Sequence, residues 1–189
     1  MTKETNLEAE VKIACGDLNR LRKAGFELEV LEPRHFEDNW LLDSADKTLL
    51  AHGAALRIRA VEGRGYVTYK GVVHEGGSTV KVREEIEVET SAPDQMFDLF
   101  ERLGFRRSFR YQKYRTTYQL TVDGAGLKVV LDETPMGTFI EIEGDETKVA
   151  LVFEAAGFSA GEIVRESYPE LQASRCKERG VPLEDLVFK

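Results

Sequence analysis

The segment Leu7-Glu8-Ala9-Glu10-Val11-Lys12-Ile13 alternates strictly between apolar and charged side chains. Because successive side chains of a β-strand point to opposite faces of its sheet, this period of two predicts a strand. One face of that strand would be apolar and would pack on a core. The other face would carry two carboxylates and a lysine, which is more charge than a solvated strand usually presents.

The same alternation recurs along the chain and predicts many short antiparallel strands. Helices are expected over about 16–25, 93–104 and 146–157, each ending in Gly-Phe, and over about 167–180. Many strands with few helices are typical of a β-barrel or a β-sandwich. Strands are expected over about 5–14, 34–43, 53–62, 65–73, 79–90, 107–121, 126–133 and 137–144.

The composition limits the classes of protein that need to be considered. The chain has 189 residues with a net charge of −8, which argues against binding to nucleic acid through its phosphates. No apolar run approaches the roughly 20 residues of a membrane span, so no membrane partner is expected. The first six residues lack the apolar stretch of a secretory signal, and Cys15 and Cys176 fit reduced thiols, so a cytoplasmic location is expected. No linker is visible, so a single domain over 1–189 is expected.

The charged faces of the expected strands are sorted into acidic and basic groups. Carboxylates two residues apart occur in the first, fifth and eighth strands, Arg57 and Arg59 in the third, and Lys113 and Arg115 in the sixth. Two arrangements are open: these faces are the solvated outside of a sheet, or they face inward in a closed barrel that helices cover. The sorting favours the second arrangement, because solvated strand faces usually mix Ser, Thr, Gln, Lys and Glu. The acidic and basic groups would then meet in one cavity.

A cavity lined by so many charges predicts a highly charged ligand. Polyphosphate fits the basic residues, because arginine binds phosphate oxygens through paired hydrogen bonds and lysine acts as a point charge. The carboxylates would repel polyphosphate unless Mg²⁺ or Mn²⁺ lay between them, since these cations prefer carboxylate and water oxygens. The basic residues of the charged faces are Lys12, Arg57, Arg59, Lys70, Lys81, Arg83, Lys113, Arg115 and Lys128.

The first strand resembles the Glu-x-Glu-x-Lys signature of the CYTH superfamily, the triphosphate tunnel metalloenzymes. The resemblance extends over about residues 5–170 and implies an α+β fold, an eight-stranded antiparallel β-barrel (tunnel) with helices packed on the outside. Further matching segments follow in the family's order: Leu56-Arg57-Ile58-Arg59, Thr68-Tyr69-Lys70-Gly71, Lys81 to Glu89, Lys113-Tyr114-Arg115, Asp132 and Glu141-Ile142-Glu143.

The same resemblance implies roles for these residues. Glu8, Glu10 and Lys12 are the expected catalytic residues. The residues expected to hold one or two Mg²⁺ or Mn²⁺ ions are Glu8, Glu10, Asp132, Glu141 and Glu143. Triphosphate would be held by Arg57, Arg59, Lys70, Lys113 and Arg115, with Lys81 and Arg83 as helpers.

Three functions remain open. Attack of water on the terminal phosphate would make the protein a triphosphatase for tripolyphosphate, thiamine triphosphate or a nucleotide, which needs only a phosphate-binding site. Attack by the ribose 3′-hydroxyl of ATP would make it a class IV adenylate cyclase. The segment Ser167–Leu171 resembles the Ser-Tyr-x-x-Leu segment of those cyclases, although helix packing also explains it. Adenine would need a stacking partner such as Trp40, Phe36, Tyr66 or Tyr69, which core or rim packing also explains. A non-enzymatic polyphosphate or nucleotide binder would not need the carboxylates, and a homodimer is compatible with the sequence.

Overall fold

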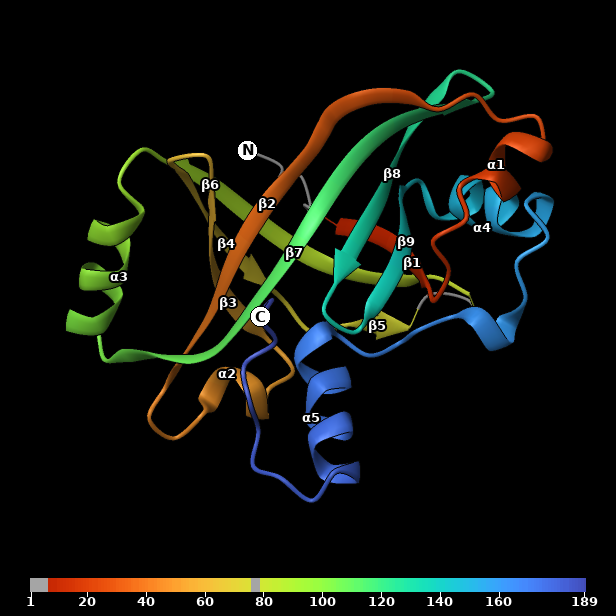
Figure 1. The fold of residues 1–189 in the computed structure, drawn as a ribbon. Helices are drawn as coiled ribbons and strands as arrows, with labels where there is room; N and C mark the ends of the chain where they lie inside the picture. Colours follow the sequence, from red (N-terminus) through yellow and green to blue (C-terminus); the bar gives the residue numbers. More distant parts are fainter. Residues whose placement is uncertain (1–6, 76–78) are drawn as a thin grey trace. The chain divides into compact units, whose positions relative to one another are not determined.

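The computed structural model describes residues 7–75 and 79–189, so residues 1–6, with the start of the first expected strand, lie outside the described part. The strands are β1 (Leu7–Ile13), β2 (Glu29–Ser44), β3 (Ala55–Val61), β4 (Arg64–Lys70), β5 (His74–Glu75), β6 (Lys81–Thr90), β7 (Phe105–Val122), β8 (Ala125–Thr134) and β9 (Gly137–Gly144). The helices are α1 (Asn19–Lys23), α2 (Thr48–Ala51), α3 (Pro93–Arg102), α4 (Glu146–Ala155) and α5 (Tyr168–Glu178), with a 3₁₀ turn at Ala160–Glu162 (Figure 1).

The strands pair in the order β1-β9-β8-β7-β2-β3-β4-β6, and β6 also pairs with β1. That last pairing closes the hydrogen-bond ladder, because Glu8 and Glu10 of β1 stand opposite Arg83 and Lys81 of β6. The two-residue strand β5 adds to β6 alone. The expected eight-stranded antiparallel barrel is therefore confirmed.

The chain divides into two compact units. Among the described residues, the first unit comprises 7–35, 73–75, 79–84 and 114–165, and the second comprises 36–72, 85–113 and 166–189. Each of the strands β2, β6 and β7 has one part in the first unit and one part in the second. The expectation of a single domain stays a prediction.

The core of the first unit lies between its strands and two helices. Val11 and Ile13 of β1 pack with Leu21 of α1 and with Val149 and Val152 of α4, all of them almost inaccessible to solvent. Burial of each such side chain contributes about 1.5–3 kcal/mol of transfer free energy. Figure 1 shows α1 and α4 side by side next to β1 and β9. The helices thus cover the apolar strand face, which leaves the charged residues of β1 on the opposite face.

The second unit has its own smaller core. Leu42 of β2 and Ile58 of β3 pack with Phe97, which lies on the inner side of α3. Trp40 meets Phe97 edge to face, with ring centroids 6.2 Å apart. Here too the helix covers the apolar face of its strands, as the alternation predicted.

A tail after α5 covers an edge of β7. The pairing of β7 with β8 begins at Tyr114, and the preceding part of β7 pairs there with the tail instead. The Gln112 N–H donates to the Leu186 carbonyl at 2.8 Å, and the Leu186 N–H donates to the Arg110 carbonyl at 2.9 Å. The tail therefore satisfies backbone groups that would otherwise form an open sheet edge.

Three short elements were not expected from the sequence: the strand β5, the helix α2 and the 3₁₀ turn at Ala160–Glu162. The strand β5 has two residues, and α2 has four, so neither is long enough to show a period. The side chain of Asp43 explains α2, because its carboxylate accepts hydrogen bonds from the N–H groups of Leu49 and Leu50, both at 3.0 Å.

Two further expectations concern thiols and membranes. Cys15 and Cys176 are both free, as expected. Within the described residues, no helix is long and apolar enough to cross a bilayer. The cytoplasmic location stays a prediction.

Candidate active site

Three buried carboxylates converge on the charged face of the first unit. Glu10 of β1 stands directly opposite Glu143 of β9, and Lys12 stands opposite Glu141. One carboxylate oxygen from each of Glu10, Glu141 and Glu143 lies within 4.8 Å of the other two. All three residues are less than a tenth exposed. Buried oxygen ligands at this spacing are the donors that Mg²⁺ and Mn²⁺ prefer.

Cationic side chains partner two of these three carboxylates. Glu141 lies 3.4 Å from the Lys12 amine and accepts a hydrogen bond from Arg115 at 2.7 Å. Glu143 forms an ion pair with Lys128, whose amine also lies 3.7 Å from Glu8. Burial alone would lower the pKa of Lys128, but the charge of Glu143, the hydrogen bond to it and the charge of Glu8 together outweigh burial, so that pKa lies above its usual value.

Glu10 differs from its two neighbours. Within residues 7–75 and 79–189, no hydrogen bond or ion pair reaches its carboxylate, although the side chain is 91% buried. A buried carboxylate beside two others is costly without a compensating positive charge. The donor set therefore fits a divalent cation, which would supply that charge.

Asp132 and Arg115 form a close pair next to the three carboxylates. Arg115 donates from Nε and Nη2 to the two Asp132 oxygens at 2.7 and 2.6 Å, and Asp132 is fully buried. Both Asp132 oxygens thus orient Arg115, and Asp132 lies outside the group of three convergent carboxylates. Glu8 also lies outside that group. Metal binding by Asp132 or Glu8 stays a prediction, as does phosphate binding by Arg115.

Lys81 and Arg83 lie on β6 in the first unit. They stand opposite Glu10 and Glu8 of β1, and both are half-buried. The structure thus brings these two predicted phosphate ligands to the strand of the acidic motif. Their helper role stays a prediction.

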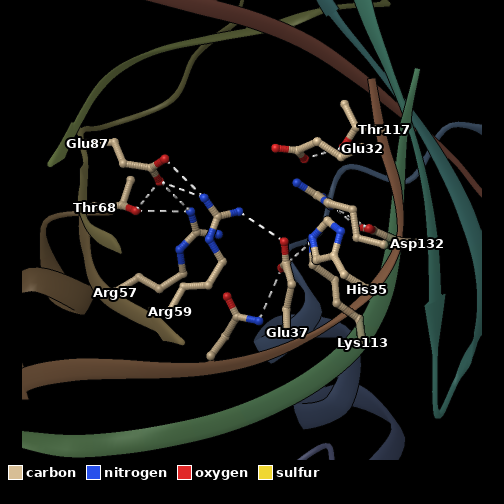
Figure 2. Close-up of polar contacts among 12 residues, drawn as sticks. Glu32, His35, Glu37, Arg57, Arg59, Thr68, Glu87, Lys113, Thr117 and Asp132 are labelled. Carbon is tan, nitrogen blue, oxygen red and sulfur yellow. Dashed lines mark hydrogen bonds and ion pairs between the residues drawn. The ribbon is translucent and has the colours of Figure 1, made fainter. Parts of the chain in front are cut away.

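In the second unit, Arg57 and Arg59 lie beside a threonine and a glutamate. Arg57, Thr68 and Glu87 form one row across β3, β4 and β6, because Thr68 is the cross-strand partner of both. Arg57 donates to Thr68 at 3.0 Å and to Glu87 at 3.2 Å, and Arg59 donates to Glu87 at 3.0 Å. Figure 2 shows both guanidinium groups directed at the Glu87 carboxylate.

A second carboxylate, Glu37 of β2, holds the other side of Arg59. Arg59 Nη1 donates to Glu37 at 3.1 Å, and the Lys113 amine lies 3.4 Å from the same side chain. Lys70 pairs separately with Glu85. Arg57, Arg59, Lys70 and Lys113 therefore all lie in one unit with anionic partners, and their phosphate binding stays a prediction.

Sequence reasoning missed Glu37 and Glu87 as members of this cluster. The available signal was the alternation of side chains along the strand, which puts Glu87 on the same face as Lys81, Arg83 and Glu85. Glu37 lies outside the segments that resemble the family, so no motif identified it.

Neighbouring charges oppose the effect of burial on the pKa values of this cluster. Burial would lower the pKa of Arg57, but the Tyr111 phenol and the carboxylates of Glu37 and Glu87 outweigh it, and the pKa is raised. Burial would raise the pKa of Tyr111, but the charges of Arg57 and Lys113 outweigh it, and the pKa is lowered. Arg57 Nη1 lies 3.4 Å from the Tyr111 hydroxyl.

Two of the four aromatic candidates for base stacking contact other side chains, and two are partly exposed. Trp40 contacts Phe97, and the guanidinium of Arg110 lies 4.8 Å from its ring centroid. The guanidinium of Arg59 lies 4.8 Å from the ring centroid of Tyr66. Phe36 and Tyr69 are 39% and 36% exposed.

The Ser167–Leu171 segment begins α5. Ser167 and Glu170 form a capping box, in which each side chain bonds to the backbone of the other residue. Tyr168 is buried, and its ring centroid lies 5.6 Å from the Lys113 amine. Capping and packing thus account for this segment.

Comparisons with known proteins agree with this geometry. The model of the CYTH domain family matches residues 6–168. A protein of Methanocaldococcus jannaschii named "Putative adenylate cyclase" is 30% identical over 180 residues, which is 88% of this chain and 98% of that protein.

Solved structures show the same fold. A protein of Vibrio parahaemolyticus described as a "putative adenylate cyclase" has a TM-score of 0.73 at 18% identity, covering 89% of this chain and 98% of its own. A Hippeastrum protein described as a "putative adenylyl cyclase" with a dominant triphosphatase activity has a TM-score of 0.60 at 21% identity, covering 94% of this chain and 99% of its own.

Proposed function

Because the chain belongs to the CYTH domain family, we propose that it is a divalent-metal-dependent triphosphatase. Members of this family are generally metal-dependent triphosphatases or cyclases. The proposed substrate is tripolyphosphate or an organic triphosphate, of which the terminal phosphate is hydrolysed. The observation that carries the proposal is the convergence of Glu10, Glu141 and Glu143 with no cationic partner for Glu10 in the described part of the chain. A non-enzymatic anion binder would gain nothing from buried carboxylates.

In this proposal the carboxylates of the first unit hold Mg²⁺ or Mn²⁺. When bound, the ion supplies positive charge that neutralises phosphate oxygens and activates the attacking group. Lys12 and Arg115 fix Glu141 from two sides, at 3.4 and 2.7 Å, so that its carboxylate is oriented before the ion arrives. Asp132 holds Arg115 through two hydrogen bonds and thereby acts as a positioning residue.

The cationic residues of the second unit are proposed to bind phosphate oxygens. Arg57 and Arg59 offer forked donors, and Lys113 offers a point charge. Burial of Arg57 and Lys113 strengthens their interaction with an anion, because the local dielectric constant is lower than that of water. Attack of water forms a new bond to the terminal phosphorus as the bond to its bridging oxygen breaks, and the proton of the water passes to solvent. The chain's cations stabilise the charge that develops on the leaving group.

Adenylate cyclase activity is the second candidate. The name of the Methanocaldococcus jannaschii protein favours it, since that protein is 30% identical over most of both chains. Trp40 meets Phe97 edge to face, so packing explains one of the residues considered for adenine stacking. The Hippeastrum protein, which shares the fold, is described as having a dominant triphosphatase activity despite its cyclase name.

The test is a parallel assay of tripolyphosphate and ATP with Mg²⁺ or Mn²⁺. Orthophosphate and cyclic AMP are measured separately, and EDTA serves as the metal-free control. We expect orthophosphate from tripolyphosphate, little cyclic AMP, and loss of both with EDTA. Cyclic AMP with pyrophosphate as the main products would establish the cyclase, and activity that is unaffected by EDTA would refute the metal dependence.

A further inference from the structure

Glu87 occupies the donors that the proposed function assigns to phosphate. Its carboxylate accepts hydrogen bonds from Arg57 Nη2 at 3.2 Å, from Arg59 Nη2 at 3.0 Å and from the Thr68 hydroxyl at 2.6 Å (Figure 2). A carboxylate oxygen between two guanidinium groups has the same partners that a phosphate oxygen would have. A phosphate bound by these arginines must therefore compete with Glu87.

The two carboxylates of this cluster differ in burial. The Glu37 side chain is 1% exposed and is fixed by Arg59 and Lys113, so its release would bury an unpaired charge. The Glu87 side chain is 37% exposed, so water can solvate its carboxylate when it leaves the arginines. Glu87 can thus be displaced at lower cost than Glu37.

Glu87 is also ionised and therefore a real competitor. Burial would raise the pKa of its carboxyl, but Arg59, the Thr68 hydroxyl and Arg57 together hold that pKa below its usual value. Glu87 and Thr68 are cross-strand partners, which keeps the carboxylate within reach of both arginines.

We infer that Glu87 is an internal competitor that sets how tightly polyphosphate anions bind to Arg57 and Arg59. This inference rests on the proposed phosphate-binding role of those arginines. A ligand with several phosphate groups gains enough contacts elsewhere to displace Glu87. A shorter product anion gains fewer contacts, so Glu87 returns to the arginines and favours its release.

The test measures binding of tripolyphosphate and of pyrophosphate to the full chain in EDTA by isothermal titration calorimetry. Glu87→Gln removes the competing charge and should lower the Kd of both anions by about threefold to thirtyfold. Glu89→Gln is the matched control, because Glu89 lies on the same strand face and pairs at 3.6 Å with exposed Arg64. It should leave both Kd values within about twofold.

Glu87→Asp is a second variant that tests the same inference if Glu87→Gln does not fold. It keeps the negative charge of the cluster but shortens the side chain, so its Kd should lie between those of the wild type and Glu87→Gln. Thermal unfolding of each variant reports whether the fold is retained. In the presence of metal, the inhibition constant of pyrophosphate should fall in parallel with Kd.

The outcomes separate this inference from the proposed function. An unchanged or increased Kd in folded Glu87→Gln and Glu87→Asp would overturn the inference and make Glu87 a residue that positions the arginines. If Arg57→Lys left the Kd of tripolyphosphate unchanged, the phosphate-binding role itself would fail. Weaker binding in Arg57→Lys without tighter binding in the Glu87 variants would refute the inference alone.

Discussion

The two charged clusters arise from the same strand alternation but have different charge balances. In the first unit, Glu10, Glu141 and Glu143 converge, and Glu10 has no cationic partner among the described residues. In the second unit, Arg57 and Arg59 share the Glu87 carboxylate, and Arg59 also pairs with Glu37. The comparison teaches that one cluster is electrostatically incomplete without a cation, whereas the other is complete until an anion displaces a partner.

The largest expected effect comes from Glu10→Gln, which removes one charge from the incomplete cluster. Turnover of tripolyphosphate with Mg²⁺ or Mn²⁺ should fall by at least about 100-fold, because even residues behind the direct metal ligands typically contribute 10–100-fold. Steady-state kinetics measures this loss, and calorimetry with Mn²⁺ should show weaker binding. The melting temperature should not fall, because no bond to Glu10 is lost.

Glu154→Gln is the matched control for that experiment, since Glu154 is an exposed carboxylate of α4 in the same unit. It should leave both turnover and Mn²⁺ binding unchanged. Wild-type activity in Glu10→Gln would show that Glu10 does not hold the metal. It would also contradict the conclusion that the acidic cluster is incomplete without a cation.

Arg57→Lys tests the other cluster with a smaller expected effect. Lysine keeps the charge but cannot donate a fork to an oxyanion, so kcat/KM for tripolyphosphate should fall about tenfold to hundredfold. This range corresponds to about 1.5–3 kcal/mol for hydrogen bonds to charged groups. Arg64→Lys is the control, because Arg64 lies on the neighbouring strand and is 60% exposed. An unchanged kcat/KM in Arg57→Lys would show that the second unit does not bind the substrate.

The smallest effect is expected at an ion pair outside both clusters. Arg20 donates to Glu162 at 2.5 Å, and this bond, with the Ser159 N–H, lowers the pKa of Glu162 from 4.5 to about 2. A carboxyl whose pKa is lowered by folding stabilises the protein above its unfolded pKa. That stabilisation is lost as the pH falls from about 4.5 towards 2.

Thermal unfolding of the wild type and Glu162→Gln across this range measures the effect. The wild type should melt slightly higher near neutral pH, and the difference should shrink in acid, where the protonated carboxyl resembles the amide. Other carboxyls titrate in both proteins and cancel in the difference. A difference that stays constant with pH would show that the charge of Glu162 contributes nothing.

Much of the fold was predictable because alternation is a local property of the sequence. The segment Leu7–Ile13 identified β1, and Glu141-Ile142-Glu143 identified the matching part of β9. The pairing of Glu10 with Glu143 follows from strand register, which no local pattern reveals. The resemblance to the CYTH superfamily implied an eight-stranded antiparallel barrel, and the observed strand pairing confirmed it.

The candidate site was less predictable than the fold. Sequence reasoning identified the carboxylates and arginines but not their partners, because partners such as Glu37 and Glu87 come from other strands. It also grouped Asp132 with the metal ligands, which stays a prediction, and it did not foresee that both Asp132 oxygens accept hydrogen bonds from Arg115. The expectation that the acidic and basic groups share one cavity stays a prediction. Within its own unit, each of Glu10, Arg57, Lys113 and Glu141 is buried.

The tail at Asp185–Phe188 has a consequence for the order of folding. It pairs with residues 110–112, about 75 positions earlier, so this part of β7 can complete its pairing only after the tail has been synthesised. Contacts of such long sequence separation form slowly, because the intervening chain must first be brought together. A nascent chain would therefore expose unpaired amides beside Tyr111 until the tail is synthesised, and an unpaired strand edge is prone to association with other chains.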